Sequence, residues 1–315
     1  MNGKPIFVYQ EIRKNQIKTF LLLTLFIVII LALSITIGYY LNNIYQGLFI
    51  GVMVTIIVVP INLLTSKFFI IGSTKGKKIN LDNPDHMRVK NLVEGLSLSA
   101  GLKNIPEIYV LPSNIPNAFA GGFSPKSSYI GVTQGLLDIM DNMELEGVIA
   151  HEISHIAQYD VLISTVAISL FSVAIILGDM LFRISWYGGN RRSRSNESKG
   201  NIGSIILIMS IAAIILSWVI RLIGSLLNLS ISRKREYVAD ANAVRLCGYS
   251  KGLASALRKL LNQSKSKQYE KRDLQELGGE NLIGLYIFNP IKSITNLFST
   301  HPPIEDRIAK LESIY

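Results

Sequence analysis

Two histidines stand four positions apart in the segment VIAHEISHIAQYD, and a glutamate follows the first of them. On a helix, His151 and His155 project from one face, so both imidazoles can reach the same metal ion. Glu152 cannot bind that ion, but its carboxylate can hold the attacking water. This HExxH spacing is typical of zinc peptidases. The alternative is a helix with two ordinary histidines; the apolar helical pattern around the motif favours the metal site.

A third metal ligand must come from another part of the chain, because a catalytic zinc site has three protein ligands and one open position. Glu236 and Asp240 lie four positions apart in REYVAD, so both carboxylates share one helix face. One of them can bind zinc while the other accepts a hydrogen bond from a ligand histidine. Alternatively, the two carboxylates lie on a solvated helix face and pair with Arg233 and Arg235.

Long apolar stretches surround these motifs. No Asp, Glu, Lys or Arg occurs from Thr19 to Ser66, and one membrane-spanning helix needs about 20 apolar residues. We therefore predict a transmembrane hairpin in residues 1–66, with spans at Phe20–Leu41 and Leu48–Leu64. The first stretch is longer than the apolar core of a signal peptide, about 7–15 residues, and lacks a small-residue cleavage site. An uncleaved anchor is the better interpretation.

Basic residues flank this hairpin on both sides, at Lys4, Arg13, Lys14, Lys18, Lys67, Lys75, Lys77 and Lys78. The positive-inside rule then places both flanks in the cytoplasm, together with the domain that follows them. The net charge of +10 requires no nucleic acid partner, because basic flanks also suit an anionic lipid surface. The single cysteine, Cys247, excludes an intrachain disulfide.

A second apolar pair lies between the two candidate metal motifs, in residues 161–222. Its members are Val161–Phe182 and Ile202–Ile220, and the basic segment RRSRS lies between them. The two motifs must meet at one ion, so the chain between them crosses the bilayer twice or not at all. Two crossings would place the basic segment outside, against the positive-inside rule. The pair therefore either spans the membrane or dips into it.

The remaining segments, residues 67–160 and 223–315, predict one mixed catalytic domain. Residues 86–102 show apolar positions at helical spacing, PEIYVLPS is typical of a short strand, and NAFAGGFSPKSSYIGV is typical of two strands joined by a Gly-Pro turn. Asp141 and the following Asn142 can cap the helix that carries the HExxH motif.

Four motifs together resemble the HtpX-type membrane metalloproteases, which are related to the CAAX prenyl endopeptidases. They are NAFAGG (117–122), HEISH (151–155), SRKREYVADANA (232–243) and STHPPIEDRI (299–308). With the apolar pairs, the resemblance covers nearly the whole chain. It implies a mainly α membrane protein with a zincin-like α+β catalytic domain, two N-terminal transmembrane helices and a second apolar helical pair inserted between the zinc motifs.

The resemblance also implies the chemistry of the site. It predicts one Zn²⁺ per chain, bound by His151, His155 and Glu236. It assigns the role of general base to Glu152 and places Asp240 behind a ligand histidine.

The resemblance further predicts where substrate binds. The NAFA segment becomes an edge strand beside the site, where the substrate backbone adds as a further strand. The closest residues are Asn117, Ala118 and Phe119. His301 and Arg307 lie near the zinc and hold substrate or the developing oxyanion; alternatively, His301 only begins a helix and Arg307 forms a surface ion pair. Gly121 stands where many relatives have Thr, which loosens the turn after the edge strand.

We therefore expect a membrane-integrated zinc endopeptidase of the cell (plasma) membrane, with a cytoplasmic catalytic domain. Its substrates are membrane or membrane-associated proteins, and the resemblance alone implies a role in protein quality control. One alternative is a processing protease with a single substrate, such as a prenylated peptide. A non-catalytic scaffold would need a closed zinc site with four ligands. A transporter would need ionisable residues inside its spans, where only Asp179 is found.

Overall fold

The computed structural model describes residues 5–40, 42–191, 233–267, 269, 273–279, 282, 285–289 and 302–314. The predicted span Ile202–Ile220, the basic segment before it and His301 lie outside the described residues. The chain divides into two compact units. One consists of Met1–Lys18, Lys67–Val166 and Leu227–Tyr315, and the other of Thr19–Ser66 and Ala167–Leu226.

A four-stranded sheet lies in the first unit, with the strand order β1-β2-β4-β3. Its strands are β1 (Lys77–Lys78), β2 (Glu107–Leu111), β3 (Ala118–Gly121) and β4 (Tyr129–Thr133). β4 runs parallel to β2 and antiparallel to β3, and all five of its residues are buried. The predicted strands at PEIYVLPS and NAFAGG are confirmed, and β3 ends the sheet.

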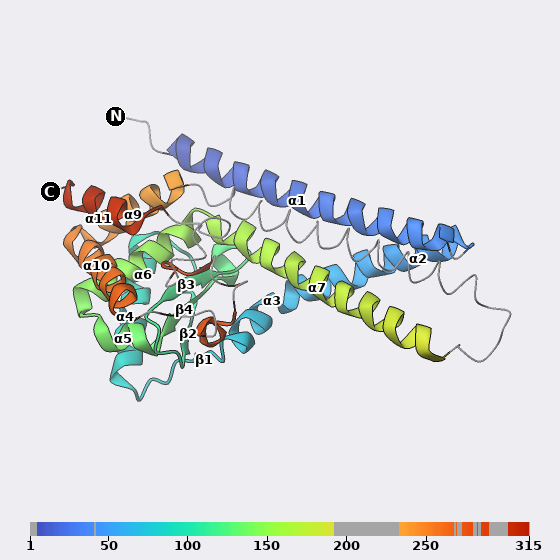
Figure 1. The fold of residues 1–315 in the computed structure, drawn as a ribbon. Helices are drawn as coiled ribbons and strands as arrows, with labels where there is room; N and C mark the ends of the chain where they lie inside the picture. Colours follow the sequence, from blue (N-terminus) through green and yellow to red (C-terminus); the bar gives the residue numbers. More distant parts are fainter. Residues whose placement is uncertain are drawn as a thin grey trace. The chain divides into compact units, whose positions relative to one another are not determined.

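Six α-helices of the described chain lie wholly within this unit, and Figure 1 labels them beside the sheet. They are α4 (Pro84–Ser99), α5 (Gln134–Ile139), α6 (Asn142–Ala157), α9 (Arg233–Cys247), α10 (Lys251–Ser266) and α11 (Ile304–Glu312). Helix α6 contacts α4, α9, α10 and β3. It therefore lies at the centre of the core, and most of its residues are buried.

The start of α6 is defined by its cap. Asp141 accepts a hydrogen bond from the Glu144 backbone at 2.9 Å, and the Glu144 side chain accepts one from the Asp141 backbone at 2.9 Å. This capping box confirms the predicted helix start. Farther along, Gly147 lies so close to α10 that an added Cβ would come within 2.6 Å of the Leu253 nitrogen. Both features determine where the HExxH face of α6 points.

Helix α6 ends in a sharp turn before α7 (Asp160–Arg191). Tyr159 has a φ of 61°, a left-handed conformation that a bulky residue adopts only under strain. In an uninterrupted helix, a residue five positions after His155 would point to a different face. The turn at Tyr159 instead returns the side chain of Asp160 to His155, with consequences for the metal site.

Apolar helices make up the described part of the second unit. The elements that enter it are α1 (Pro5–Tyr40), α2 (Ile44–Met53), the π-helix η1 (Val54–Val58), α3 (Val59–Ser73) and α7. Within the described residues, three stretches are long and apolar enough to span a membrane: Arg13–Tyr39, Ile44–Ser73 and Asp160–Asp179. The first two stretches contain most of the predicted N-terminal spans, Phe20–Leu41 and Leu48–Leu64. The third contains most of the predicted span Val161–Phe182. The π-helix lies just before Pro60, whose ring cannot take a normal place in an α-helix.

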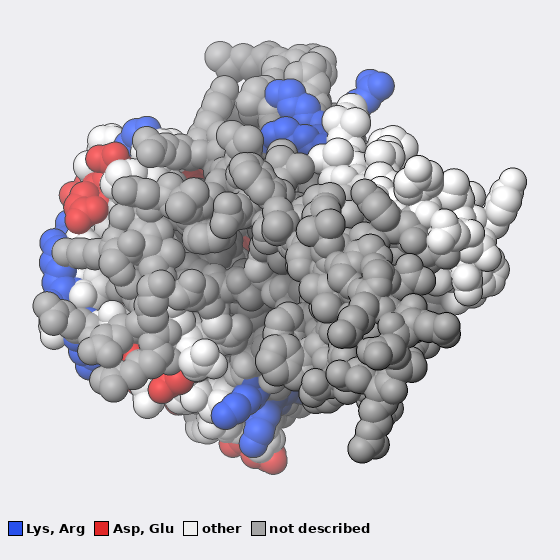
Figure 2. Space-filling view, turned by 45° about the vertical axis from the view of Figure 1, so that its right-hand side comes forward, with Lys and Arg blue, Asp and Glu red and all other residues white. Residues whose placement is uncertain are grey.

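Small residues join α1 and α2. An added Cβ on Gly47 would come within 2.3 Å of the Ser34 carbonyl oxygen, and one on Gly38 within 2.8 Å of the Gly47 Cα. Such close backbone approach is typical of helix packing in membranes. Large apolar side chains on the helices of this unit are exposed, including Phe20 on α1 and Leu64 on α3, at 68% and 77%. In Figure 2, most of the described residues on the right-hand side carry no charge. Such surfaces are suited to lipid.

Candidate metal centre and active site

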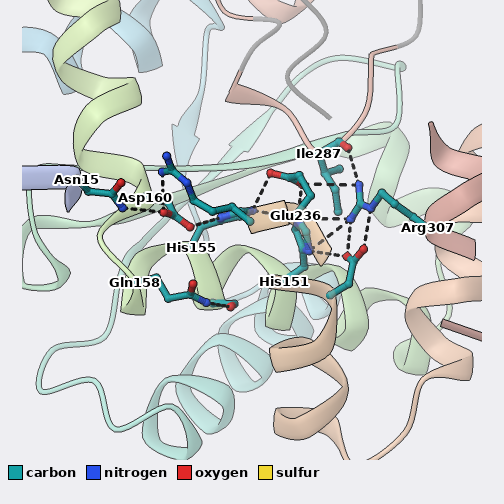
Figure 3. A network of polar contacts seen from close by, with 11 residues as sticks. Asn15, His151, His155, Gln158, Asp160, Glu236, Ile287 and Arg307 are labelled. Atoms are coloured by element: carbon teal, nitrogen blue, oxygen red, sulfur yellow. Dashed lines mark hydrogen bonds and ion pairs between the residues drawn. The ribbon is translucent and has the colours of Figure 1, made fainter. Parts of the chain in front are cut away.

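Two helices bring three ligand-type side chains together. His151 and His155 belong to α6 and Glu236 to the first turn of α9, and their ligand atoms all lie within 4.8 Å of one another. The Nε2 atoms of the two histidines are 3.1 Å apart. Each of them lies 3.5 Å from one carboxylate oxygen of Glu236. The fold therefore joins two motifs that the second apolar pair separates in the sequence (Figure 3).

This donor set fits zinc. With bonds of about 2.0–2.1 Å, the ligand atoms of a tetrahedral zinc site are about 3.3 Å apart, close to the separations within the cluster. Two imidazole nitrogens and one carboxylate are also the ligands of known catalytic zinc sites. The side chain of His155 is 13% exposed, whereas those of His151 and Glu236 are 0% and 1% exposed. The cluster is thus most accessible beside His155.

Behind His151 lies a buried carboxylate–arginine pair. His151 Nδ1 lies 2.9 Å from Asp240 Oδ1, on the side of the ring opposite the cluster. Arg307, on α11, donates to both oxygens of Asp240, from Nε at 2.9 Å and from Nη2 at 2.7 Å. Its Nη1 atom lies 3.4 Å from the Ile287 carbonyl oxygen and 4.0 Å from Glu236. We call His151, Asp240 and Arg307 the His151 side of the site.

A second carboxylate–arginine pair lies behind His155. His155 Nδ1 is 3.1 Å from Asp160 Oδ2. The other oxygen of Asp160 accepts from Arg235 Nη1 at 3.0 Å and from Asn15 Nδ2 at 2.9 Å. These donors come from α9 and α1, and the carboxylate belongs to α7 (Figure 3). We call these four residues the His155 side.

Negative charge dominates the electrostatics of the cluster. Burial alone lowers the pKa of His155, but the charge of Glu236 and the hydrogen bond to Asp160 outweigh it and raise this pKa to about 9. Burial alone raises the pKa of Asp240, but the Arg307 charge and the hydrogen bond from His151 lower it to about 2. Asp240 therefore stays ionised. An excess of negative charge around two imidazoles is what a divalent cation neutralises.

Glu152 lies on α6 beside the cluster and is buried, with 3% of its surface exposed. Its charge acts on both His155 and Arg307, which lie on opposite sides of the cluster. A carboxylate beside the cluster can accept a proton from a molecule bound there and later donate the proton back.

The predicted substrate-binding residues Asn117, Ala118 and Phe119 are buried, and the outer edge of β3 is already paired. Phe119 forms an antiparallel bridge with Tyr286, and the Ile287 N–H donates to the Ala118 carbonyl oxygen at 2.9 Å. The Asn117 side chain donates to the Phe288 carbonyl oxygen at 2.7 Å and accepts from the Phe288 nitrogen at 3.3 Å. We call Tyr286–Phe288 the covering segment.

The structure groups most of the residues that the sequence singles out. Glu236 and Asp240 are both buried, which excludes the solvated helix face. Arg307 is buried as well, so it does not form a surface ion pair, and its guanidinium is engaged by Asp240. Whether Arg307 contacts substrate stays a prediction, and His301 lies outside the described residues.

Sequence reasoning missed the entire His155 side beyond the histidine itself. Asp160 follows His155 by five positions, which is not the spacing of a shared helix face. Asn15 lies 145 positions before Asp160. The only available signal was Arg235, directly before Glu236, and the sequence offered several partners for it.

Comparisons with known proteins identify the family of the chain. The model of "Peptidase family M48" matches residues 84–315. A "Protease HtpX homolog" of Streptococcus uberis is 37% identical over 308 residues, covering 96% of this chain and 99% of the relative. One from Dictyoglomus thermophilum is 38% identical over 309 residues, covering 98% and 95%.

Among solved structures, the crystal structure of S. mikatae Ste24p aligns with 96% of this chain and 67% of its own, at 20% identity and a TM-score of 0.47. The family match and the full-length relatives are sufficient by themselves. The chain belongs to peptidase family M48 and is related over nearly its whole length to HtpX proteases.

Proposed function

We propose that the chain is a membrane-anchored zinc endopeptidase whose catalytic site is formed by α6 and α9. The observation that carries this proposal is the cluster of His151, His155 and Glu236, in which a carboxylate lies behind each histidine. Among the described residues, the cluster contains three ligand groups. Three protein ligands leave a position open, as catalysis requires, whereas a structural zinc site is normally closed by four.

Each residue of the site has a role in this proposal. Zinc held by the three ligands would supply a Lewis acid that polarises the scissile carbonyl and acidifies the attacking water. Glu152 accepts a proton from that water and passes it to the leaving amine. Asp240 and Asp160 each accept a hydrogen bond from an imidazole Nδ1–H, which leaves the Nε2 lone pair directed at the cluster.

Substitution of Glu152 tests this function. In detergent-purified Glu152→Gln protein, we expect zinc content equal to that of the unaltered chain and casein cleavage reduced by about 10²–10⁴-fold, the usual contribution of a general base. Glu94→Gln, an equivalent change on the partly exposed face of α4, is the matched control and should cleave normally. Undiminished cleavage by zinc-loaded Glu152→Gln protein would refute the assignment.

Substrate backbone would bind along β3, in the place of the covering segment. The backbone hydrogen bond from Ile287 to Ala118 is one that an added strand would make. The Asn117 side chain bonds the backbone N–H and C=O of Phe288, and it could bond the backbone of a substrate strand in the same way. We therefore infer that the covering segment leaves β3 when substrate enters. Among the described residues, one backbone hydrogen bond, the Asn117 side chain and the edge-to-face contact between the Phe119 and Tyr286 rings hold the covering segment to β3, so few hydrogen bonds must be exchanged for those of a substrate strand.

The membrane part of the proposal rests on the apolar helices and the basic flanks. The catalytic domain is zincin-like and cytoplasmic, the chain is a multi-pass protein of the plasma membrane, and its substrates are membrane proteins, including damaged ones. With Cys247 replaced, Tyr45→Cys in the first turn of α2 should react with an impermeant maleimide added to intact cells, and Lys103→Cys only after lysis. The opposite pattern would contradict this orientation.

A further inference from the structure

A residue at the start of the N-terminal span reaches the ligand cluster through two hydrogen bonds. Asn15 lies on α1 and is fully buried, and its Nδ2 atom donates to Asp160 at 2.9 Å. Asp160 is the first residue of α7, another candidate span. We propose that Asn15 is a positioning residue of the zinc site that acts on His155 through Asp160. This inference rests on the proposed function, because it requires zinc at the cluster.

The two carboxylate oxygens of Asp160 have different hydrogen-bond partners. Oδ1 accepts from Asn15 and Arg235, whereas Oδ2 faces His155 Nδ1 at 3.1 Å. A carboxylate rotates easily about its terminal torsion unless its oxygens are held. The two donors on Oδ1 hold it, and Oδ2 then keeps its place against the imidazole. His155 is thereby kept in one tautomer and one ring orientation, with Nε2 toward the cluster.

Asn15 contributes something that Arg235 cannot. Arg235 is on α9, the helix that also supplies the proposed ligand Glu236, so it ties Asp160 to the same helix as the cluster. Asn15 is on the helix that continues into the first candidate span. Its neighbours Lys14 and Gln16 are exposed, so the buried carboxamide is directed inward at this one position. A buried amide is stable only when it is hydrogen-bonded, which ties the anchor helix to Asp160.

The affinity of the full-length protein for zinc tests this role without relying on activity. We expect Asn15→Ala and Asn15→Leu to weaken zinc binding about tenfold, measured by competition with a chromophoric chelator; substitutions behind a ligand histidine usually cost 10–100-fold. Asn15→Leu retains the side-chain volume but loses the donor, so a role in packing alone would leave its affinity normal. Gln16→Ala removes an exposed carboxamide from the next position and should bind zinc as tightly as the unaltered chain.

A double-mutant cycle tests the route through Asp160. In an Asp160→Ala background, Asn15→Ala should weaken zinc binding by less than about twofold, because the two residues act as one unit. A tenfold effect that persists in this background would overturn the route. Thermal unfolding of the chelator-treated proteins shows whether each variant is folded, and Asn15→Leu provides the test if the Asp160 variant is not.

The outcomes separate this inference from the proposed function. If the unaltered protein binds no zinc, the proposed function fails. If the unaltered protein binds zinc and both Asn15 variants bind zinc as tightly as it does, only the positioning role of Asn15 is overturned.

Discussion

His151 and His155 are supported by the same chemical arrangement in two different settings. On each side, a carboxylate faces Nδ1 and an arginine binds that carboxylate. On the His151 side the pair is sealed, since the side chains of Arg307 and Asp240 are 1% and 5% exposed. On the His155 side, Arg235 and Asp160 are 10% and 11% exposed.

The two sides also connect the cluster to different parts of the chain. Through Arg307, the His151 side reaches α11 and the Ile287 carbonyl in the covering segment. Through Asn15, the His155 side reaches the helix that leads into the first candidate span. One side is therefore part of the core and adjoins the strand proposed for substrate. The other links the same ligand cluster to the helix of the first candidate span.

The largest expected effect comes from removing each arginine in turn. Arg307→Met should lower the free energy of unfolding by about 3–5 kcal/mol, because it leaves a buried carboxylate without its cation. Arg235→Met should cost about 1.5 kcal/mol, since Asp160 is more exposed and keeps its hydrogen bond to Asn15. The midpoints of thermal unfolding, measured on chelator-treated proteins in detergent, compare the two. Equal losses would contradict the difference between the two sides.

An intermediate effect is expected from locking the covering segment. Phe119 and Tyr286 are bridge partners on antiparallel strands, a pairing whose Cα separation of about 4.5–5.5 Å suits a disulfide. With Cys247 replaced by alanine, the oxidised Phe119→Cys/Tyr286→Cys protein should cleave casein at least about tenfold more slowly than the same protein after reduction, because substrate cannot pair with β3.

The reduced form is the control, since it contains the same substitutions. Its zinc content should equal that of the oxidised form, which places the change at the substrate strand and not at the metal. Equal cleavage by both forms would show that substrate binds without displacing the covering segment.

The smallest expected effect is the change in the reactivity of Cys247, at the end of α9, when either arginine is removed. Burial and the nearby charge of Glu146 raise the pKa of its thiol to about 12. Thiolate is the reactive form, and an ordinary thiol has a pKa of about 8.5, so labelling at pH 7.5 should be at least about 100-fold slower than in denaturant. Arg307→Met should accelerate labelling a few-fold, because Arg307 holds α9 through Asp240, and Arg235→Met should accelerate it less.

Rates of maleimide incorporation, followed by mass spectrometry, measure this difference. Labelling that is equally fast in both variants would mean that both arginines restrain α9 alike. A native thiol as reactive as the denatured one would contradict the packing of Cys247 against the Glu146 carbonyl.

The residues that the sequence predicted share one property: their relation is local. His151 and His155, and likewise Glu236 and Asp240, are spaced by four, so helical periodicity alone places each pair on one face. The start of α6 at Asp141, the strands β2 and β3 and the apolar stretches are also local patterns. The combination of four motifs then indicated the family, which the comparisons confirm.

The sequence by itself thus predicted the candidate ligand pairs, the proposed general base and the apolar helices, because periodicity and charge need no knowledge of distant contacts. Only the tertiary structure decided what stands behind His155 and what covers β3. Asp160 reaches His155 because Tyr159 adopts a left-handed turn, a conformation for which tyrosine has no preference. Asn15 and the covering segment meet their partners across 145 and 171 positions. Such contacts arise from packing, and no short-range pattern records them.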